Sequence, residues 1–237
     1  MSVPRILRPD APGRFVLLCD HASNYIPEEL YQLGLPGSEL ARHIAWDIGA
    51  AGVTELLSEM LDSPAILSGV SRLVIDCNRH PDARDLIPEV SDGTGVPGNR
   101  HLTAAARAAR IDLFRGYHDA VESVLLQREA RGAESIVASI HSMTESLAGI
   151  YRPWQIALSS YLDRSLADPV LMALRRDSAI VVGDNQPYNL DPAVDYSVPF
   201  HALRRGLPHI QVEFRQDEIA DMAGQQRWAR IFVQAIK

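Results

Sequence analysis

The sequence predicts an α/β domain built around a largely parallel sheet. Short, uninterrupted apolar runs alternate along the 237 residues with longer segments whose apolar residues recur at helical spacing. The apolar runs have the length of strands buried on both faces, which is typical of parallel sheets. No internal repeat, low-complexity tract or linker divides the chain. We therefore expect a single domain over residues 1–237.

Seven short segments rich in apolar residues are the predicted strands. They lie at residues 15–19, 65–67, 73–77, 135–140, 155–158, 179–182 and 209–214. The first run, Phe15-Val16-Leu17-Leu18-Cys19, has no polar residue, and polar side chains follow it at once. It is the strongest candidate for a central strand.

The segments between these strands predict helices and two long loops. Leu40, Ile44 and Ile48 begin a helical pattern that continues over residues 39–61. Thr103 is a suitable N-cap for a helix that runs to about residue 131. Shorter helices are predicted at residues 26–30, 168–176 and 199–205, and a last one from residue 217. Residues 80–100 and 183–199 are rich in proline, glycine and asparagine, and loops of this length usually have a function.

Composition excludes several classes of partner. With 46% hydrophobic residues the chain can bury a full core, and its net charge of −7 argues against nucleic acid or an anionic membrane as a partner. No apolar run approaches the roughly 20 residues that span a bilayer. The first five residues lack the pattern of a leader peptide. Cys19 and Cys77 lie in apolar runs, which predicts buried free thiols and a cytoplasmic location.

Polar side chains lie where three of the predicted strands end. His21 follows the first strand, His141 follows the fourth, and Glu213 lies near the end of the last. In parallel sheets these ends meet at one edge, where ligands bind. Two histidines and a carboxylate are the ligands and base of a zinc hydrolase. The alternative is that each histidine is a hydrogen-bonded polar group at the sheet end.

The acidic metal ligand is the uncertain member of this set. Asn24 stands where the His-x-x-Glu motif of many zinc peptidases has glutamate. Asp47, flanked by apolar residues in the predicted helix 39–61, is the best replacement. A surface position on that helix, or another acid near Glu28, stays open as an alternative.

Two arginines bracket the predicted strand 73–77. The planar guanidinium binds a carboxylate through two hydrogen bonds, so Asn78 and Arg79 are candidates to hold a substrate carboxylate. Arg72 is a candidate to polarise the scissile carbonyl. The alternative is that these arginines form ion pairs with acids nearby, namely Asp76, Asp82 and Asp85.

Two further sets of residues invite functional interpretations. Asn185 and Tyr188, in the second long loop, are candidate substrate contacts, although a plain turn also explains Gly-Asp-Asn. Ser142 beside His141 suggests a serine hydrolase, but no Gly-x-Ser-x-Gly motif is present. We therefore give the serine mechanism little weight.

Taken in order, these segments resemble the N-formylglutamate amidohydrolase (N-formylglutamate deformylase) family. The motifs that carry the resemblance are Asp20-His21-Ala22-Ser23, Ile26-Pro27, Asp47, residues 71–79, Ile140-His141-Ser142, residues 184–188 and residues 211–217. Each motif is short, but as an ordered set they are specific and cover most of the chain.

The resemblance implies the fold of the zinc carboxypeptidases and aspartoacylase, in which a mixed eight-stranded sheet lies between two layers of helices. It implies one Zn²⁺ ion held by His21, Asp47 and His141. Glu213 would then be the general base, and Arg72 would stabilise the oxyanion. The implied substrate is N-formyl-L-glutamate or another N-acyl amino acid, with its carboxylate held by Asn78 and Arg79. The alternative is a metal-free protein that binds small carboxylates.

Overall fold

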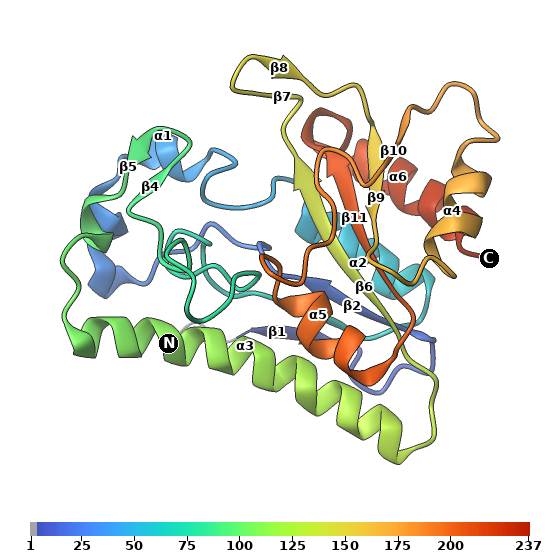
Figure 1. Cartoon of the computed structure of the whole chain (residues 1–237), viewed down its shortest axis with the longest axis horizontal. Helices are drawn as coiled ribbons and strands as arrows, with labels where there is room; N and C mark the ends of the chain where they lie inside the picture. The colour runs from blue at the N-terminus through green and yellow to red at the C-terminus, as the bar shows by residue number, and fades with distance from the viewer. Residues whose placement is uncertain (1–3) are drawn as a thin grey trace.

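The centre of the molecule is a seven-stranded sheet (Figure 1). The computed structural model describes residues 4–237, so the first three residues of the segment inspected for a leader peptide lie outside it. The strand order is β1-β3-β2-β6-β11-β9-β10. The strands are β1 (Arg5–Leu7), β2 (Phe15–Cys19), β3 (Ala65–Leu67), β6 (Ile136–Met143), β9 (Ile156–Ser159), β10 (Val182–Asp184) and β11 (His209–Arg215).

The sheet is mixed and largely parallel, as predicted. Strands β3, β2, β6 and β11 are parallel to one another, and β1 pairs antiparallel with β3 at one edge. On the other side β9 pairs antiparallel with β11, and β10 is parallel to β9. The described residues form seven strands in this sheet, rather than the eight that the resemblance implies.

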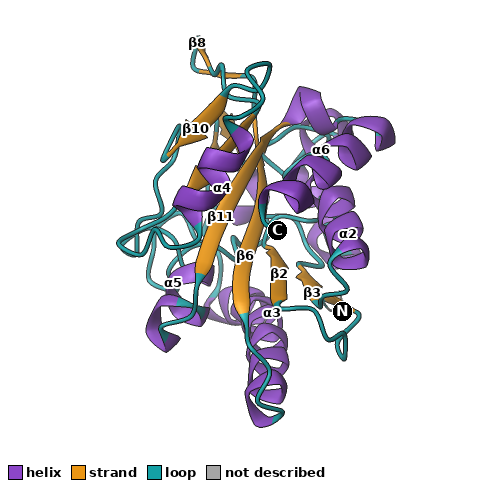
Figure 2. Ribbon diagram, turned by 90° about the vertical axis from the view of Figure 1, so that its right-hand side faces the viewer, coloured by secondary structure: helices purple, strands orange, loops and turns teal. Residues whose placement is uncertain are grey.

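Helices cover both faces of the sheet and complete three layers (Figure 2). The α-helices are α1 (Gly37–Leu40), α2 (Ala50–Met60), α3 (Ala104–Ala130), α4 (Ala167–Leu174), α5 (Ser197–His201) and α6 (Met222–Ala235). Short 3₁₀ helices occur at Glu28–Gly34, Pro97–Asn99, Leu203–Arg205 and Gln216–Ile219. The core residues of α2, α4 and α6 pack on one face, and those of α3 and α5 pack on the other. Among residues 4–237, no helix is long and apolar enough to span a membrane.

Two small hairpins extend from the loops. They are β4 (Val90–Ser91) with β5 (Thr94–Gly95), and β7 (Ser146–Leu147) with β8 (Ile150–Tyr151). The β7–β8 hairpin rises beyond the end of the sheet (Figure 1). The predicted loop at residues 80–100 therefore contains a hairpin and a helical turn.

His141 and Glu213 lie on the same face of the sheet, because side chains alternate between the two faces along β6 and β11. Ile140 and Val212 pack with α2, α4 and α6. Successive strand residues point to opposite faces, so His141 and Glu213 face the side of α3 and α5. They lie near the carboxyl ends of their strands, and the register pairs one directly with the other. The two side chains are therefore neighbours.

The predicted strand at residues 73–77 is wrong. The segment forms turns that no neighbouring strand pairs with. Its apolar side chains instead fill a second core cluster, where Leu73, Val74 and Ile75 are buried with Phe114. Burial alone produces an apolar run, so composition did not distinguish this turn segment from a strand.

The predicted helix at residues 39–61 is interrupted. Helix α1 ends at Leu40, turns follow, and α2 begins only at Ala50. Gly49 precedes α2 with φ of +81°, and a Cβ there would lie 2.3 Å from the carbonyl oxygen of Ile219. The turn therefore requires glycine. It places Asp47 in a loop, and not on the predicted helix.

Most remaining elements agree with the sequence to within a few residues, but the edge strand β1 and the two hairpins were not predicted. Thr103 caps α3 by accepting a hydrogen bond from the Ala106 amide. Strand β10 begins at Val182, later than the predicted run at residues 179–182. Both cysteines are buried free thiols, as predicted.

Candidate metal centre and active site

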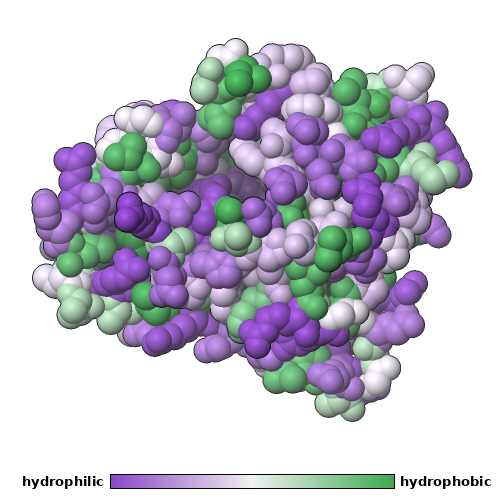
Figure 3. Space-filling model, viewed as in Figure 1, coloured by the Kyte–Doolittle hydropathy of each residue, from purple (hydrophilic) through white to green (hydrophobic). Residues whose placement is uncertain are grey.

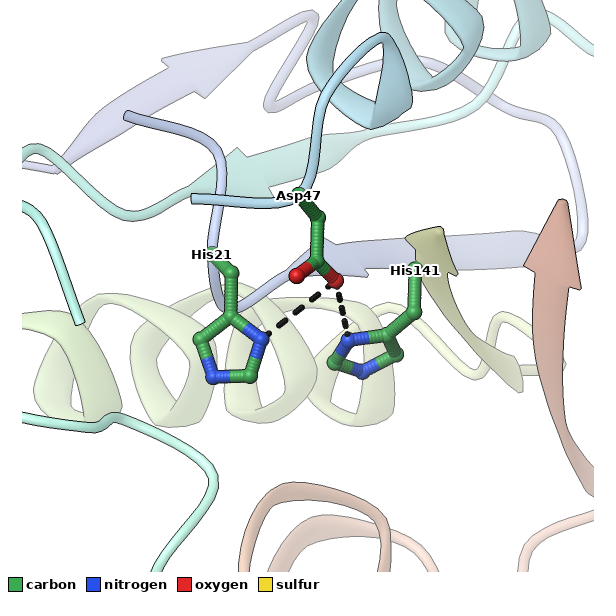
Figure 4. Close-up of side chains that lie close together, drawn as sticks. All are labelled: His21, Asp47 and His141. Carbon is green, nitrogen blue, oxygen red and sulfur yellow. Dashed lines mark hydrogen bonds and ion pairs between the residues drawn. The ribbon is translucent and has the colours of Figure 1, made fainter. Parts of the chain in front are cut away.

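Three buried side chains from separate parts of the chain converge at the carboxyl edge of the sheet. His21 follows β2, Asp47 lies in the turn before α2, and His141 lies on β6. Asp47 Oδ2 lies 2.9 Å from Nδ1 of His141 and 3.4 Å from Nδ1 of His21 (Figure 4). One potential ligand atom of each residue lies within 4.8 Å of the other two. Two imidazoles and one carboxylate are a common ligand set for catalytic zinc.

The hydrogen bonds at the far side of each ring orient both histidines toward Asp47. Nε2 of His21 lies 2.7 Å from Oδ1 of Asp76. Nε2 of His141 lies 2.9 Å from the Ser139 hydroxyl, which itself donates to Asp20, and 3.1 Å from Oδ2 of Asp20. A carboxylate only accepts, so each Nε2 carries the proton and each Nδ1 presents a lone pair. The two Nδ1 atoms and Asp47 Oδ2 are then three acceptors facing one another, an arrangement that a cation stabilises. Carboxylates behind the ligating histidines are typical of zinc sites.

The charges around the site favour a cation at its centre. Burial and the Arg72 charge act to lower the pKa of His21, but the carboxylates that contact it raise the pKa above its ordinary value. Burial likewise opposes the charged form of His141, whose carboxylate partners nevertheless raise its pKa well above the ordinary value. Burial also acts to raise the pKa of Asp47, but the two histidines hold it well below the usual range. The carboxylates therefore favour positive charge between the two rings, which a divalent metal would supply in place of the ring protons.

Glu213 lies beside this set on β11. It is buried, lines the same cavity, and pairs in register with His141. Burial, together with the negative charge of Asp47, raises the pKa of Glu213 to about 7 against the opposing effect of His141. A carboxyl group with this pKa exchanges protons readily at neutral pH.

Arg72 reaches the site from the turn segment that replaces the predicted strand. Its Nε and Nη2 donate to Asp76 Oδ2 at 3.1 and 2.7 Å, and Nη1 lies 3.5 Å from Asp47 Oδ1. The ion pair with Asp76 is the alternative that the sequence left open. The guanidinium nonetheless lines the cavity, so it can still donate to a bound molecule.

A cavity of about 550 Å³ opens over these residues. In the space-filling view a hydrophilic hollow lies below the β7–β8 hairpin (Figure 3). The cavity is lined by residues from the turn segments, the hairpin and the loop after β10. The predicted site residues that line it are His21, Asp47, Arg72, Asn78, Arg79, His141, Tyr188 and Glu213.

Asn78 lines the cavity, but its amide group is already engaged. Nδ2 donates to Asp195 at 3.0 Å, and Oδ1 accepts from the backbone amides of Tyr196 and Ser197. These bonds hold the chain before α5. Arg79 is paired with Asp85 at 2.9 Å, the second ion pair that the sequence left open. The geometry gives Asn78 a structural task and leaves Arg79 partly free.

The two residues predicted in the loop after β10 have different positions. Tyr188 lines the cavity, and its hydroxyl accepts a hydrogen bond from Arg152 at 2.8 Å. Asn185 is absent from the described lining, and its Oδ1 accepts from the Ser160 amide at 2.9 Å. A substrate contact by Asn185 therefore has no support, and the turn interpretation explains the residue.

The alternatives for the acid ligand and the nucleophile find no support either. Asn24 is exposed and donates to the carbonyl of Leu40, so it points away from the histidines. Glu28 is exposed in a 3₁₀ helix. The Ser142 hydroxyl donates to the Ile48 carbonyl at 2.9 Å, so no base activates it.

Sequence reasoning missed four polar residues of the site. Asp20 and Asp76 support the histidines, and each lies within a motif that carries the family resemblance. Gln211 is buried two residues before Glu213, lines the cavity and leaves its Oε1 without a hydrogen bond among the described residues. Arg152 also lines the cavity, and nothing in its sequence context singled it out.

Comparison with known proteins identifies the family of the chain. A family model for N-formylglutamate amidohydrolase matches residues 13–220. The crystal structure of a gene product from Agrobacterium tumefaciens is 33% identical, with a TM-score of 0.94, and the match covers 99% of this chain and 95% of that one. A comparison with curated protein sequences gave no match.

A second solved structure supports the fold. It is an N-formylglutamate amidohydrolase from Ralstonia eutropha, 17% identical, with a TM-score of 0.66 and coverage of 100% of this chain and 96% of that one. At this identity the likeness shows the fold alone. The family model, however, matches residues 13–220, which is most of the chain. The chain therefore belongs to the N-formylglutamate amidohydrolase family.

Proposed function

We propose that this protein is a zinc-dependent amidohydrolase. It hydrolyses the amide bond of N-formyl-L-glutamate or a related N-acyl amino acid, and releases formate or another carboxylate together with the amino acid. The observation that carries the proposal is the convergence of His21, Asp47 and His141, with Glu213 on the adjacent strand. The family match supports the reaction class.

The residues divide the chemistry among them. A zinc ion held by Nδ1 of His21, Nδ1 of His141 and Asp47 Oδ2 would act as a Lewis acid and lower the pKa of the attacking water. Glu213 takes the proton of that water and delivers it to the nitrogen of the leaving amine. Arg72 donates hydrogen bonds to the oxyanion that forms on the attacked carbonyl, an effect typically worth about 3 kcal/mol for one donor.

The surroundings of the site fit a small anionic substrate. A cavity of about 550 Å³ has the size of ordinary small-molecule sites. Arginine guanidinium groups on its wall complement the carboxylate that every N-acyl amino acid carries. Two buried free thiols suit a reducing, cytoplasmic setting.

The decisive experiment separates metal binding from proton transfer. We expect Glu213→Gln to retain zinc, measured by elemental analysis of the purified protein, and to lose hydrolysis of N-formyl-L-glutamate. The matched control is Glu134→Gln, an exposed acid paired with Arg14, which should keep full activity. Full activity in Glu213→Gln would refute the mechanism.

Chelation distinguishes the enzyme from the metal-free carboxylate-binding protein. The proposed enzyme loses activity with a chelator and recovers it with Zn²⁺. A binding protein that relies on Arg72 and Arg79 alone would show the same thermal stabilisation by small carboxylates with or without the chelator.

A further inference from the structure

Three arginines line the cavity, and they differ in how their charges are compensated. Arg72 contacts Asp76 at 2.7 Å, and Arg79 contacts Asp85 at 2.9 Å. Arg152 has no carboxylate within 4.0 Å in the part of the chain that the structure describes. The uncompensated positive charge of the wall is therefore at Arg152.

Arg152 is buried, with 7% of its surface exposed, and its polar partners are neutral. Nη1 donates to the Thr144 hydroxyl at 3.2 Å, and Nη2 donates to the Tyr188 hydroxyl at 2.8 Å. The guanidinium also lies 5.0 Å from the centroid of the Tyr188 ring, within the range of a cation–π contact. A buried charge is costly unless an opposite charge pairs with it. The described residues provide no anion to pair with this charge, so the site is suited to an anion supplied by a ligand.

The backbone holds this guanidinium at the catalytic edge of the sheet. Arg152 lies between the β7–β8 hairpin and β9, and its carbonyl accepts from Arg215 at the end of β11. Thr144 directly follows β6, the strand of His141. Strands β6 and β11, which carry His141 and Glu213, therefore also position Thr144 and Arg215, the residues that hold Arg152.

We propose that Arg152, held by Thr144 and Tyr188, binds a carboxylate of the N-acyl amino acid substrate. The inference rests on the amidohydrolase function proposed above and names the residue that recognises the substrate. It differs from the assignment of that task to Asn78 and Arg79, because Asn78 is engaged and Arg79 already has a carboxylate partner. The planar guanidinium keeps Nε for the bound anion, since no described residue accepts from it.

The kinetic test compares substrates that differ by one charge. We expect Arg152→Gln to raise the KM for N-formyl-L-glutamate by about 10- to 100-fold, the usual effect of losing a charge-assisted hydrogen bond, with a smaller change in kcat. Two analogues each replace one carboxylate with an amide: N-formyl-L-glutamine and N-formyl-L-isoglutamine. The variant should show no KM penalty with the analogue that lacks the recognised carboxylate. Equal penalties on all three substrates would overturn the proposal.

Two further variants test whether the effect arises from misfolding and whether Arg79 recognises the carboxylate instead. Tyr188→Phe keeps the ring, which is 41% exposed, and removes the hydroxyl, so it should raise the KM for N-formyl-L-glutamate in the same direction and less strongly. Arg79→Gln tests the rival, and a larger KM penalty there than in Arg152→Gln would overturn the assignment. The control Arg131→Gln replaces an exposed arginine paired with Asp10 and should behave as wild type.

A binding measurement separates this inference from the function on which it rests. Glutarate carries two carboxylates and no amide, so its binding by calorimetry needs no turnover. Weakened glutarate binding in Arg152→Gln supports the carboxylate site even if wild type fails to hydrolyse N-formyl-L-glutamate. Unchanged glutarate binding and unchanged KM in Arg152→Gln would overturn the inference while leaving the hydrolase intact.

Discussion

Replacing Asp76 by asparagine tests how the surrounding residues support the proposed metal site. Asp76 Oδ1 lies 2.7 Å from Nε2 of His21, and the carboxylate is buried with a pKa well below its usual range, since Arg72 and His21 outweigh the effect of burial. Asparagine keeps the shape but removes the negative charge that makes the histidine a stronger ligand. Losses of 10- to 100-fold in metal affinity are typical for such partners, or about 1.4–2.7 kcal/mol.

A second contact acts in the same direction. Arg72 donates twice to Asp76 and lies 3.5 Å from Asp47. Once the ion pair with residue 76 is lost, the guanidinium interacts more strongly with Asp47 and competes with a cation for that carboxylate. We therefore expect the loss in affinity to lie toward the upper end of the range.

The assay is a zinc titration of Asp76→Asn in competition with a chromophoric chelator, which reports affinity independently of catalysis. The control is Asp85→Asn, an acid in the same irregular segment that pairs with Arg79 and has a 62% exposed side chain. It should bind zinc as wild type does. Wild-type zinc affinity in Asp76→Asn would refute the role of this carboxylate.

Two further predictions concern stability. Gly49→Ala forces a residue with a side chain into a left-handed conformation and against Ile219. We expect this variant to lower the free energy of unfolding by about 2 kcal/mol and to weaken zinc binding through Asp47. The control Gly116→Ala, in open space on α3, should not lower the stability of the protein. Burial lowers the pKa of His118 to about 4, so the folded state resists protonation and stability falls as the pH drops from about 6.5 to 4. The difference between this pKa and the ordinary value of 6.5 corresponds to about 3 kcal/mol. His118→Gln keeps an acceptor for His201 and a donor for the Cys77 carbonyl. Urea denaturation of this variant should show about 3 kcal/mol less acid destabilisation than wild type, and equal pH profiles for the two proteins would contradict the prediction. Unchanged stability of Gly49→Ala would contradict the first prediction.

The sequence was most informative where a residue follows directly from a strand. Strand β2 is an apolar run and β11 alternates polar with apolar residues, and both were predicted with their bounds nearly correct. Parallel neighbours then bring His21 and His141 to one edge without further assumptions. This part of the site depends only on strand periodicity and direction.

The rest of the site depends on features that local sequence does not record. Asp47 occupies a turn created by Gly49 and the approach of Ile219, a contact between segments far apart in the chain. Arg152 reaches the site because β9 runs antiparallel to β11, which brings the residues before β9 to the edge where the other strands end. A search limited to the residues after strands overlooks it. The apolar segment at residues 73–77 was wrongly predicted as a strand, because a second core cluster outside the sheet buries its side chains.

The register of β6 and β11 separates the chemistry of this protein from its selectivity. His141 and Glu213 are paired residues on two central strands, so backbone hydrogen bonds set their spacing and no loop can change it. Arg79, Arg152 and Tyr188 stand on loops around the same cavity. Relatives could therefore exchange one acyl amino acid for another by substituting loop residues, while the distance between the proposed base, Glu213, and the proposed metal ligand, His141, stays the same.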